Sequence, residues 1–267
     1  MHCAAIMSDL PENPGGHAAV RKLLSLAHLR EEDCHLYLEA LGRRVRHIPA
    51  RTDITHEGDN PRAVRVVLEG WACRYKELPD GRRQILAFFV PGDLCDSAVF
   101  LLDQMDHSIA TITPVTLGEI TPDVFSQMTR ESTELADALA LNELVTVAIQ
   151  REWTLGLGQR NALERVAHLL CELYARLDAI GLVTDGQCHL PLTQIDIGSA
   201  TGLTSVHVNR VLQELRRDGV IELTRRRLTI HRPAALGRAA MFDPVYLHLR
   251  QLPRVAAVRP APEAFAP

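Results

Sequence analysis

The stretch LTQIDIGSATGLTSVHVNRVLQEL, residues 192–215, has the pattern of two short helices joined by a tight turn. Thr193 is well placed to cap the first helix with its hydroxyl group. Gly202 can end that helix in the left-handed conformation, and Gly198 allows a second helix to approach closely. The expected buried side of the first helix comprises Ile195, Ile197 and Ala200. The stretch therefore predicts a helix-turn-helix, centred on residues 193–218.

The second helix of this pair starts after Thr204 or Ser205, either of which can cap it. Arg210 lies on the expected outer side, where its guanidinium can reach a guanine edge or a phosphate. The side chains predicted to contact DNA are Thr193, Thr204, Ser205, Val206, His207, Asn209, Arg210 and Gln213, together with Arg225 and Arg226 from the segment that follows. A plain helical hairpin with solvated polar groups is the alternative interpretation.

A basic hairpin follows the two helices. Residues 220–223 and 227–230 have strand character around a turn at 224–226. Between Leu192 and Arg232 there are seven arginines and four acidic residues, a local charge of +3 in a chain whose net charge is −4. The overall acidity excludes a protein that coats DNA but permits one basic face. A helix-turn-helix with a basic wing is more specific for DNA than either feature alone.

Upstream, regularly spaced glycines indicate a β domain. Gly58, Gly70, Gly81 and Gly92 are separated by 12, 11 and 11 residues, and Asp80-Gly81 is a hairpin dipeptide. Strands are expected at residues 63–68, 71–77, 83–89, 107–113 and 116–120. Short strands at this spacing predict an antiparallel roll or barrel that closes near residue 122.

The helix expected over residues 133–155 carries a seven-residue repeat. It lacks Gly and Pro, and we expect Gly156 and Gly158 to end it. The repeat predicts a dimer interface made by Leu135, Ala138, Asn142, Val145 and Ile149, with Asn142 fixing the register of a two-chain coiled coil. The same pattern also fits a helix that packs on its own β domain. A further helix is expected at residues 160–177.

The predicted domains are a flexible arm (1–20), a sensor domain (21–132), a dimerisation helix (133–158), a winged helix-turn-helix domain (159–250) and a flexible tail (251–267). The composition, 46% apolar and 23% charged over 267 residues, is that of a globular chain with two modules. Six scattered cysteines, the absence of a signal sequence and the lack of an apolar run of about 18 residues favour a cytoplasmic protein that does not enter the membrane. No catalytic motif is present, so we do not expect an enzyme.

With these motifs, the sequence resembles the Crp/Fnr family of bacterial transcription regulators over about residues 21–250. The resemblance rests on Val67-Leu68-Glu69-Gly70, Asp80-Gly81-Arg82-Arg83-Gln84-Ile85, Val90-Pro91-Gly92-Asp93-Leu94 and the segment from Gly202 to Leu215. It implies an α+β fold with an N-terminal antiparallel β roll of the cyclic-nucleotide-binding type, a long dimerisation helix and a C-terminal winged helix-turn-helix. It also implies a homodimer on a near-palindromic DNA site, which contacts RNA polymerase when it activates.

Departures from the family pattern bear on the effector. Family members that bind cyclic AMP carry a Gly-Glu pair and a phosphate-binding Arg-Ser pair. The corresponding places here give an effector region of Cys95, Asp96, Ser97, Asp106, His107 and Ser108. Asp106 would repel a phosphate, so cyclic AMP is not expected. At the recognition helix, Ser205 and Val206 replace the family's Arg and Glu base readers, while Arg210 remains.

We predict no cofactor and no metal site. Cys3 and Cys34 are too isolated for the iron–sulfur cluster of the oxygen-sensing branch. Haem is not excluded, and its candidate ligands are His47, His56, His107, Cys73 and Cys95. The alternative to DNA binding is an effector or redox sensor whose winged helix contacts a protein partner. Retention on DNA with a steep salt dependence would distinguish the two, because only phosphate neutralisation predicts it.

Overall fold

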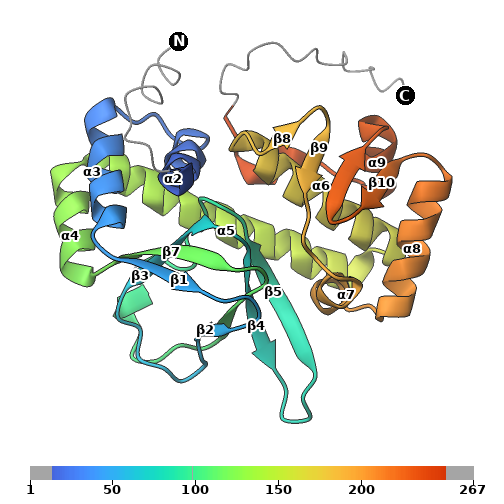
Figure 1. The fold of residues 1–267 in the computed structure, drawn as a ribbon, viewed down its shortest axis with the longest axis horizontal. Coiled ribbons are helices and arrows are strands. Elements are labelled where there is room, and N and C mark those ends of the chain that lie inside the picture. The colour runs from blue at the N-terminus through green and yellow to red at the C-terminus, as the bar shows by residue number, and fades with distance from the viewer. Residues whose placement is uncertain (1–13, 98, 251–267) are drawn as a thin grey trace.

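The computed structural model describes residues 14–97 and 99–250. A β roll with three helices at one end is joined by one long helix to a second α/β unit (Figure 1). The predicted tail at 251–267 and the first 13 residues of the predicted arm lie outside the described residues. In the described part of the chain, no helix is apolar over a length sufficient to cross a membrane.

The roll consists of two antiparallel sheets, as expected. One has the order β1-β7-β3 and the other β2-β6-β4-β5. The strands are β1 (Val45–Ile48), β2 (Asp53–Thr55), β3 (Val64–Glu69), β4 (Ala72–Glu77), β5 (Arg83–Phe89), β6 (Ser108–Thr111) and β7 (Val115–Ile120). The five predicted strands are confirmed to within a few residues at each end, whereas β1 and β2 lacked a clear alternating pattern. The roll supplies the frame on which the helices pack.

Three helices cover one end of the roll: α2 (Pro14–Leu24), α3 (Glu31–Gly42) and α4 (Pro122–Glu131). The prediction of a flexible arm through residue 20 is therefore wrong for residues 14–20. Ala19 and Val20 are fully buried in a cluster with Val64 and Val66 of β3, so tertiary packing supplies what the local pattern lacked. Helix α2 lies close to the turn after β5, because a Cβ at Gly92 would lie 2.5 Å from the Ala18 carbonyl oxygen.

The long helix α5 (Thr133–Gln159) passes alongside both halves of the molecule (Figure 1). Ser132 caps it by accepting a hydrogen bond from the Leu135 amide at 2.9 Å. The helix ends at Gln159, one residue after Gly158, so it continues through Gly156. The Gly156 carbonyl accepts a hydrogen bond from the Arg160 amide, and Arg160 Nη1 donates to the Glu152 carbonyl at 3.1 Å, so Arg160 holds the last turn in place.

The predicted dimer seam on α5 faces the chain's own core. Leu135 and Ala138 pack with α2 and α3, while Val145 and Ile149 pack on Leu26 and Leu247. All five predicted interface residues are at most 8% exposed: Leu135, Ala138, Asn142, Val145 and Ile149. Their assignment to a contact between chains is corrected here, because α2, α3 and the C-terminal segment cover this side of the helix. The interpretation in which α5 packs on its own domain holds for this face.

The C-terminal unit has the winged-helix arrangement. Its sheet has the order β10-β11-β9-β8, with helices packed on one side. The elements are α6 (Ala162–Ala179), β8 (Val183–Thr184), β9 (Gln187–His189), α7 (Gln194–Thr201), α8 (Ser205–Arg217), β10 (Ile221–Thr224), β11 (Arg227–Ile230), α9 (Pro233–Ala240) and the short 3₁₀ helix η2 (Pro244–Leu247). The predicted helix-turn-helix and wing hairpin are present.

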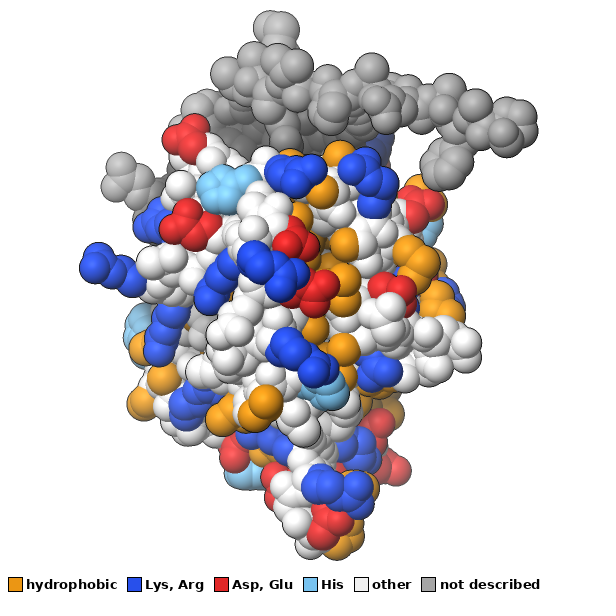
Figure 2. All heavy atoms as spheres, turned by 90° about the vertical axis from the view of Figure 1, so that its right-hand side faces the viewer, with side chains coloured by type: hydrophobic (Ala, Val, Ile, Leu, Met, Phe, Trp, Pro, Cys, Tyr) orange, Lys and Arg blue, Asp and Glu red, His pale blue; other side chains and the backbone are white. Residues whose placement is uncertain are grey.

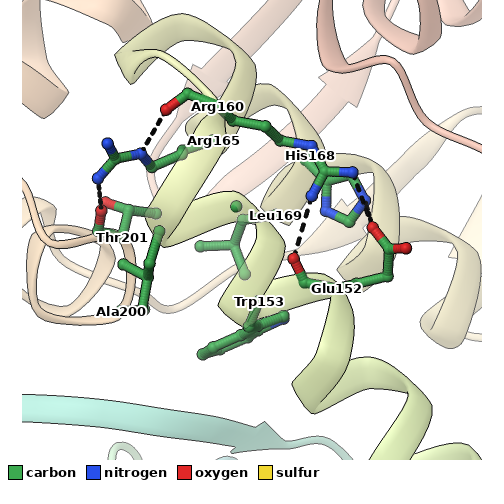
Figure 3. Close-up of a pocket in the computed structure, with 10 residues that line it drawn as sticks. Glu152, Trp153, Arg160, Arg165, His168, Leu169, Ala200 and Thr201 are labelled. Carbon is green, nitrogen blue, oxygen red and sulfur yellow. Dashed lines mark hydrogen bonds and ion pairs between the residues drawn. The ribbon is translucent and has the colours of Figure 1, made fainter.

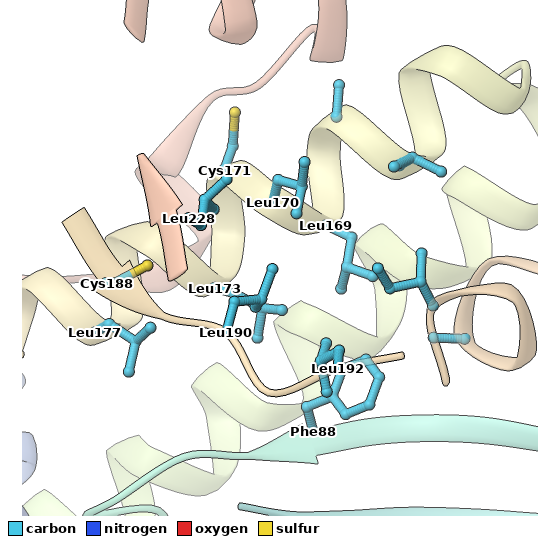
Figure 4. Close-up of a cluster of buried hydrophobic side chains, with 14 of the residues drawn as sticks. Phe88, Leu169, Leu170, Cys171, Leu173, Leu177, Cys188, Leu190, Leu192 and Leu228 are labelled. Atoms are coloured by element: carbon cyan, nitrogen blue, oxygen red, sulfur yellow. The ribbon is translucent and has the colours of Figure 1, made fainter. Parts of the chain in front are cut away.

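The two halves share a hydrophobic core (Figure 4). Phe88 of β5 is fully buried and meets Leu190 and Leu192, which lie in the segment between β9 and α7. The Phe88 ring also contacts Trp153 of α5 edge-on, with centroids 5.9 Å apart. Because the cluster runs without a break from the roll into the winged helix, the winged-helix unit packs firmly against the roll.

Buried charges cross the same junction. Asp93, which follows β5, accepts a hydrogen bond from Arg176 Nη2 at 2.6 Å and forms an ion pair with Lys22 Nζ at 3.3 Å. Arg176 of α6 also donates to the Phe88 carbonyl at 2.8 Å and to Glu172 at 3.1 Å. These four charged residues are at most 6% exposed: Lys22, Asp93, Glu172 and Arg176. We call them the buried charge network.

The network reaches two further elements through Glu172. Its Oε2 atom accepts hydrogen bonds from Trp153 Nε1 of α5 and from the Tyr246 hydroxyl of η2, each at 3.0 Å. Burial raises the pKa of Glu172. Burial also opposes ionisation of Asp93, but Arg176 and Lys22 outweigh it and hold the pKa of that carboxyl below its ordinary value. Five segments distant in the sequence are thus fixed to one another by charge-assisted hydrogen bonds.

Replacing Asp93 by Asn should lower the free energy of unfolding by about 3–5 kcal/mol, because Lys22 then remains buried without a counterion and Arg176 keeps only Glu172. Urea unfolding followed by circular dichroism measures the change. The exposed Asp103 provides the matched control, and Asp103→Asn should leave the unfolding midpoint within experimental error. Equal effects of the two substitutions would contradict the structural role of the network.

Candidate nucleic-acid interface

Each helix of the helix-turn-helix is capped by the side chain that the sequence predicts. Thr193 Oγ1 accepts a hydrogen bond from the Asp196 amide at 3.1 Å, and Asp196 Oδ2 accepts one from the Thr193 amide at 2.9 Å, which completes a capping box on α7. Thr204 Oγ1 accepts from the His207 amide at 3.2 Å and caps α8. The caps fix where α8 begins and therefore which side chains occupy its first turn.

Two glycines set the angle between the helices. Gly202 ends α7 with φ of 66° and ψ of 32°, the left-handed conformation that favours glycine. A Cβ at Gly198 would lie 2.5 Å from the Leu203 carbonyl oxygen, so only glycine allows this approach. The prediction for Ile195 is wrong, because its side chain is 68% exposed. Ile197 and Ala200 alone supply the buried side of α7, since Ile195 lies on the opposite side of the short helix.

The structure leaves nearly all predicted DNA contacts open to solvent. Exposed residues are Thr193, Thr204, Ser205, Val206, His207, Arg210, Gln213, Arg225 and Arg226. Asn209 is half-buried, and its Oδ1 atom accepts a hydrogen bond from Gln194 Nε2 of α7 at 3.1 Å. Figure 2 shows arginine side chains spread over the face that carries α8, with apolar groups between them. Their roles in DNA contact stay predictions.

The wing carries two arginines in an unfavourable backbone conformation. Thr224 pairs with Arg227, so Arg225 and Arg226 form a two-residue turn with φ of 49° and 63°. Such a turn requires positive φ at both positions and is normally made by Asn-Gly. The left-handed conformation costs a residue with a Cβ about 1–2 kcal/mol. The strained turn therefore favours a role for these two side chains other than stabilising the fold.

The β roll holds α7 directly, a contact that the sequence did not reveal. Arg51, in the loop between β1 and β2, forms a bidentate ion pair with Asp196 at 2.7 and 2.8 Å. Burial opposes ionisation of Asp196, but the Arg51 guanidinium and Thr193 keep its pKa low. Gln84 Nε2 of β5 donates to the Ala200 carbonyl at 3.2 Å. Both ends of α7 are thereby attached to the roll.

The structure brings the predicted effector residues together around a cation that the sequence analysis missed. Arg74 of β4 is 7% exposed and pairs with the Asp96 carboxylate. His107 bridges two carboxylates, with Nε2 3.2 Å from Asp96 and Nδ1 2.6 Å from Asp106. That hydrogen bond holds the pKa of Asp106 below its ordinary value. The Asp106 side chain is exposed, so only Arg74, Asp96 and His107 form the inner part of this cluster.

The remaining effector residues tie this region to its surroundings. The Cys95 carbonyl accepts a hydrogen bond from Arg74 Nη2 at 2.5 Å, and the Ser97 amide donates to Glu143 Oε1 of α5 at 3.1 Å. Ser108 Oγ accepts from the Glu57 amide at 2.9 Å. Among the described residues, the buried Arg74 Nε and Ser97 Oγ have no hydrogen-bond partner. The region therefore contacts the long helix as well as the sheet.

Within residues 14–97 and 99–250, no group of three or more His, Cys, Asp or Glu side chains is arranged to hold a metal ion. Burial raises the pKa of the Cys73 thiol to about 11 and raises that of Cys95 as well. The two cysteines among the candidate haem ligands are thus held as thiols, whereas the thiolate is the form that binds iron.

A small cavity lies where α5 meets α6, next to the end of α7 (Figure 3). It offers about 30 Å³ to the centres of water-sized molecules, room for water rather than an effector. Arg165 closes one side by donating to the Arg160 and Thr201 carbonyls at 2.8 and 2.9 Å. His168, 4% exposed, lies stacked on Tyr246, and its buried Nε2 is 3.5 Å from Glu152 Oε2.

Comparison with known proteins agrees with this architecture. Residues 45–132 match the family described as cyclic nucleotide-binding domain, and residues 164–239 match the Crp-like helix-turn-helix domain. The chain is 33% identical over 233 residues to the nitrogen fixation regulation protein FixK of Bradyrhizobium diazoefficiens. The match covers 83% of this chain and 93% of FixK. It is 32% identical over 207 residues to the transcriptional activatory protein AadR of Rhodopseudomonas palustris, covering 77% and 84%.

A solved structure shows the same arrangement. FixK2 from Bradyrhizobium japonicum matches with a TM-score of 0.66 and 26% identity, over 73% of this chain and 96% of that chain. A cyclic-nucleotide-binding-type roll joined by a long helix to a winged helix-turn-helix defines a class of two-domain transcription regulators. Within that class, the chain belongs to the Crp/Fnr family. The predictions of fold class and family are confirmed.

The buried His168 gives the fold a dependence on pH. Burial and the nearby Arg160 lower its pKa from 6.5 to about 4, although Glu152 acts in the opposite direction. The unfolded chain therefore takes up a proton between pH 6.5 and 4 that the native protein does not. As the pH is lowered through this interval, the free energy of unfolding should fall by up to about 3 kcal/mol. His168→Gln should flatten this part of the pH profile, measured by urea unfolding.

The exposed His207 provides the control, and His207→Gln should leave the slope unchanged. The slope of stability against pH is the readout, since His168→Gln also alters packing against Tyr246. An unchanged slope between pH 6.5 and 4 in the His168 variant would show that this histidine is not buried in its neutral form.

Proposed function

We propose that this protein is a DNA-binding transcription regulator that binds a near-palindromic promoter site as a homodimer. The exposed first turn of α8, capped by Thr204 and carrying Arg210 one turn further along, is the observation that carries the proposal. Capped helices of this kind enter the major groove of DNA. Catalysis is no part of the proposal, and the protein would act in the cytoplasm on double-stranded DNA and contact RNA polymerase where it activates.

The dimer is proposed to form through the outer side of α5. After the correction of the predicted seam, the exposed positions on this helix include Ala140, Leu144, Val147, Arg151 and Leu155. Their spacings of four, three, four and four residues place them in one stripe along the helix. Leu144 and Val147 are 62% and 42% exposed, an unusual exposure for large aliphatic side chains on a regular helix. A second copy of α5 would bury this stripe.

The division of labour between domains follows the predicted boundaries: residues 21–132 as sensor, 133–158 as dimerisation helix and 159–250 as DNA-binding domain. We further propose that the sensor roll does not take cyclic AMP. Arg74 is the buried cation in the effector region, and Asp96 already neutralises it, so a phosphate would have to displace a carboxylate from a buried ion pair. The Arg51 and Asp196 contact is the direct route from the roll to α7.

The alternative, a sensor whose winged helix contacts a protein partner, is favoured less by the observations. The wing keeps Arg225 and Arg226 in left-handed conformations, and α8 ends with Arg216 and Arg217. An excess of arginines over acidic residues around a helix-turn-helix suits a polyphosphate backbone. The experiment below separates the two functions because only DNA binding predicts release of counterions.

DNA binding should respond differently to substitutions in α8 and in the wing. Arg210→Ala should weaken binding to a selected site by about 1–3 kcal/mol, because it removes a base or phosphate contact.

Arg225→Asn with Arg226→Gly should reduce the slope of log K against log salt by about two per protomer, while the relaxed turn raises the melting temperature. Fluorescence anisotropy with labelled duplexes between 50 and 300 mM salt measures both effects.

Arg82, exposed at the tip of the β4–β5 hairpin, provides the control, and Arg82→Ala should change neither affinity nor slope. A chain that binds no duplex above non-specific levels, or that binds with no salt dependence, would overturn the proposed function in favour of a protein partner.

Self-association should depend on the outer stripe of α5. Leu144→Glu should raise the dissociation constant of the dimer at least about tenfold, because two carboxylates would be brought to an apolar seam. Light scattering at micromolar concentrations measures the mass. Leu78→Glu, a matched change at a 51% exposed leucine on the hairpin tip, should leave the dimer intact. A Leu144→Glu protein that stays fully dimeric would exclude this stripe as the interface.

A further inference from the structure

Val206 is an apolar side chain with nothing to pack against. It lies in the first turn of α8 and is 78% exposed, whereas Val208, two residues further, is fully buried. A β-branched residue gains little from an exposed helix position, since its rotamers are restricted and it contributes no cap. Its neighbours in this turn, Ser205 and His207, are both polar and exposed. The fold therefore does not account for valine at this position.

We propose that Val206 recognises the 5-methyl group of a thymine in each half-site, and this proposal rests on the proposed function. The edges of the bases in the major groove present hydrogen-bond donors and acceptors, and thymine adds one apolar group, its methyl. The two methyl groups of valine cannot exchange hydrogen bonds with any base. Contact with a thymine methyl is the direct readout that this side chain can perform, and it buries apolar surface on both partners.

The position of Val206 relative to Arg210 limits where that thymine lies. The two residues are separated by four positions and share one face of α8, about 6 Å apart along the helix axis. Arg210 is exposed and can bind the O6 and N7 atoms of a guanine in the same groove. Successive base pairs are about 3.4 Å apart, so the thymine should lie within about two base pairs of the contact made by Arg210.

The experiment begins with selection of bound duplexes from a random pool, using the full chain. Each thymine of the selected site is then replaced, in both half-sites, by deoxyuridine, which lacks only the methyl group. Removing the recognised methyl should weaken binding about three- to fourfold in one half-site and about ten- to fifteenfold in both, as expected for one buried methyl each. Other thymines should tolerate the replacement.

Val206→Ala should reduce the effect of deoxyuridine at that position, because alanine offers the thymine methyl less apolar surface, and it should leave thermal stability unchanged, because the side chain is exposed. Ile195→Ala provides the control, since Ile195 is another exposed aliphatic residue of the same motif, at 68%, but lies on α7. It should retain the full loss on deoxyuridine. A cytosine at the sensitive position should bind weakly, and 5-methylcytosine should recover affinity.

The outcomes separate this proposal from the proposed function. Salt-dependent, sequence-selective binding with every thymine tolerant of deoxyuridine would overturn the role of Val206 and leave DNA binding intact. The same conclusion follows if Val206→Ala remains as sensitive to deoxyuridine as the native chain. Failure to select any duplex would instead remove the proposed function, and with it the basis for this inference.

Discussion

The hydrogen-bonded ion pair between Asp93 and Arg176 is the constraint on which the rest of the structure depends. It joins the turn after β5 to the last turn of α6, and both side chains are almost fully buried. A buried charge is tolerated only when its partners are in place, so this pair admits few other positions of the winged helix relative to the roll. Lys22 adds α2 to the same carboxylate, and Glu172 adds Trp153 and Tyr246.

Direct attachment bears on how the β roll could influence the helix-turn-helix. The shared core around Phe88 and the Arg51 and Asp196 contact join the roll to α7 directly. A shift in the roll must therefore be carried into the helix-turn-helix or break a buried contact. The cluster of Arg74, Asp96 and His107 lies in the same roll and reaches α5 through its neighbour Ser97. Rearranged pairing in that cluster would act on the long helix.

The sequence predicts best what local chemistry decides. The caps of α7 and α8, the left-handed Gly202 and the wing turn depend on residues within a few positions of one another, and all were recovered. The errors lie where tertiary packing decides. The heptad pattern on α5 identifies an apolar face, but it cannot show that α2 and η2 cover that face. The pattern of α7 predicts that Ile195 is buried, but the orientation of this short helix leaves the side chain exposed. Arg74 and Arg51 gave no signal because their partners are distant in sequence.

A rigid protomer also separates two properties of DNA recognition. In the proposed dimer, α8 is held to α5 through α6 and the buried charge network, so the distance between the two recognition helices would depend on how the α5 helices pack, through residues such as Leu144. The bases read in each half-site would depend instead on the first turn of α8. A different residue at position 206 would therefore change the sequence that is read without altering half-site spacing. The wing, which contributes positive charge, would set the affinity for either sequence.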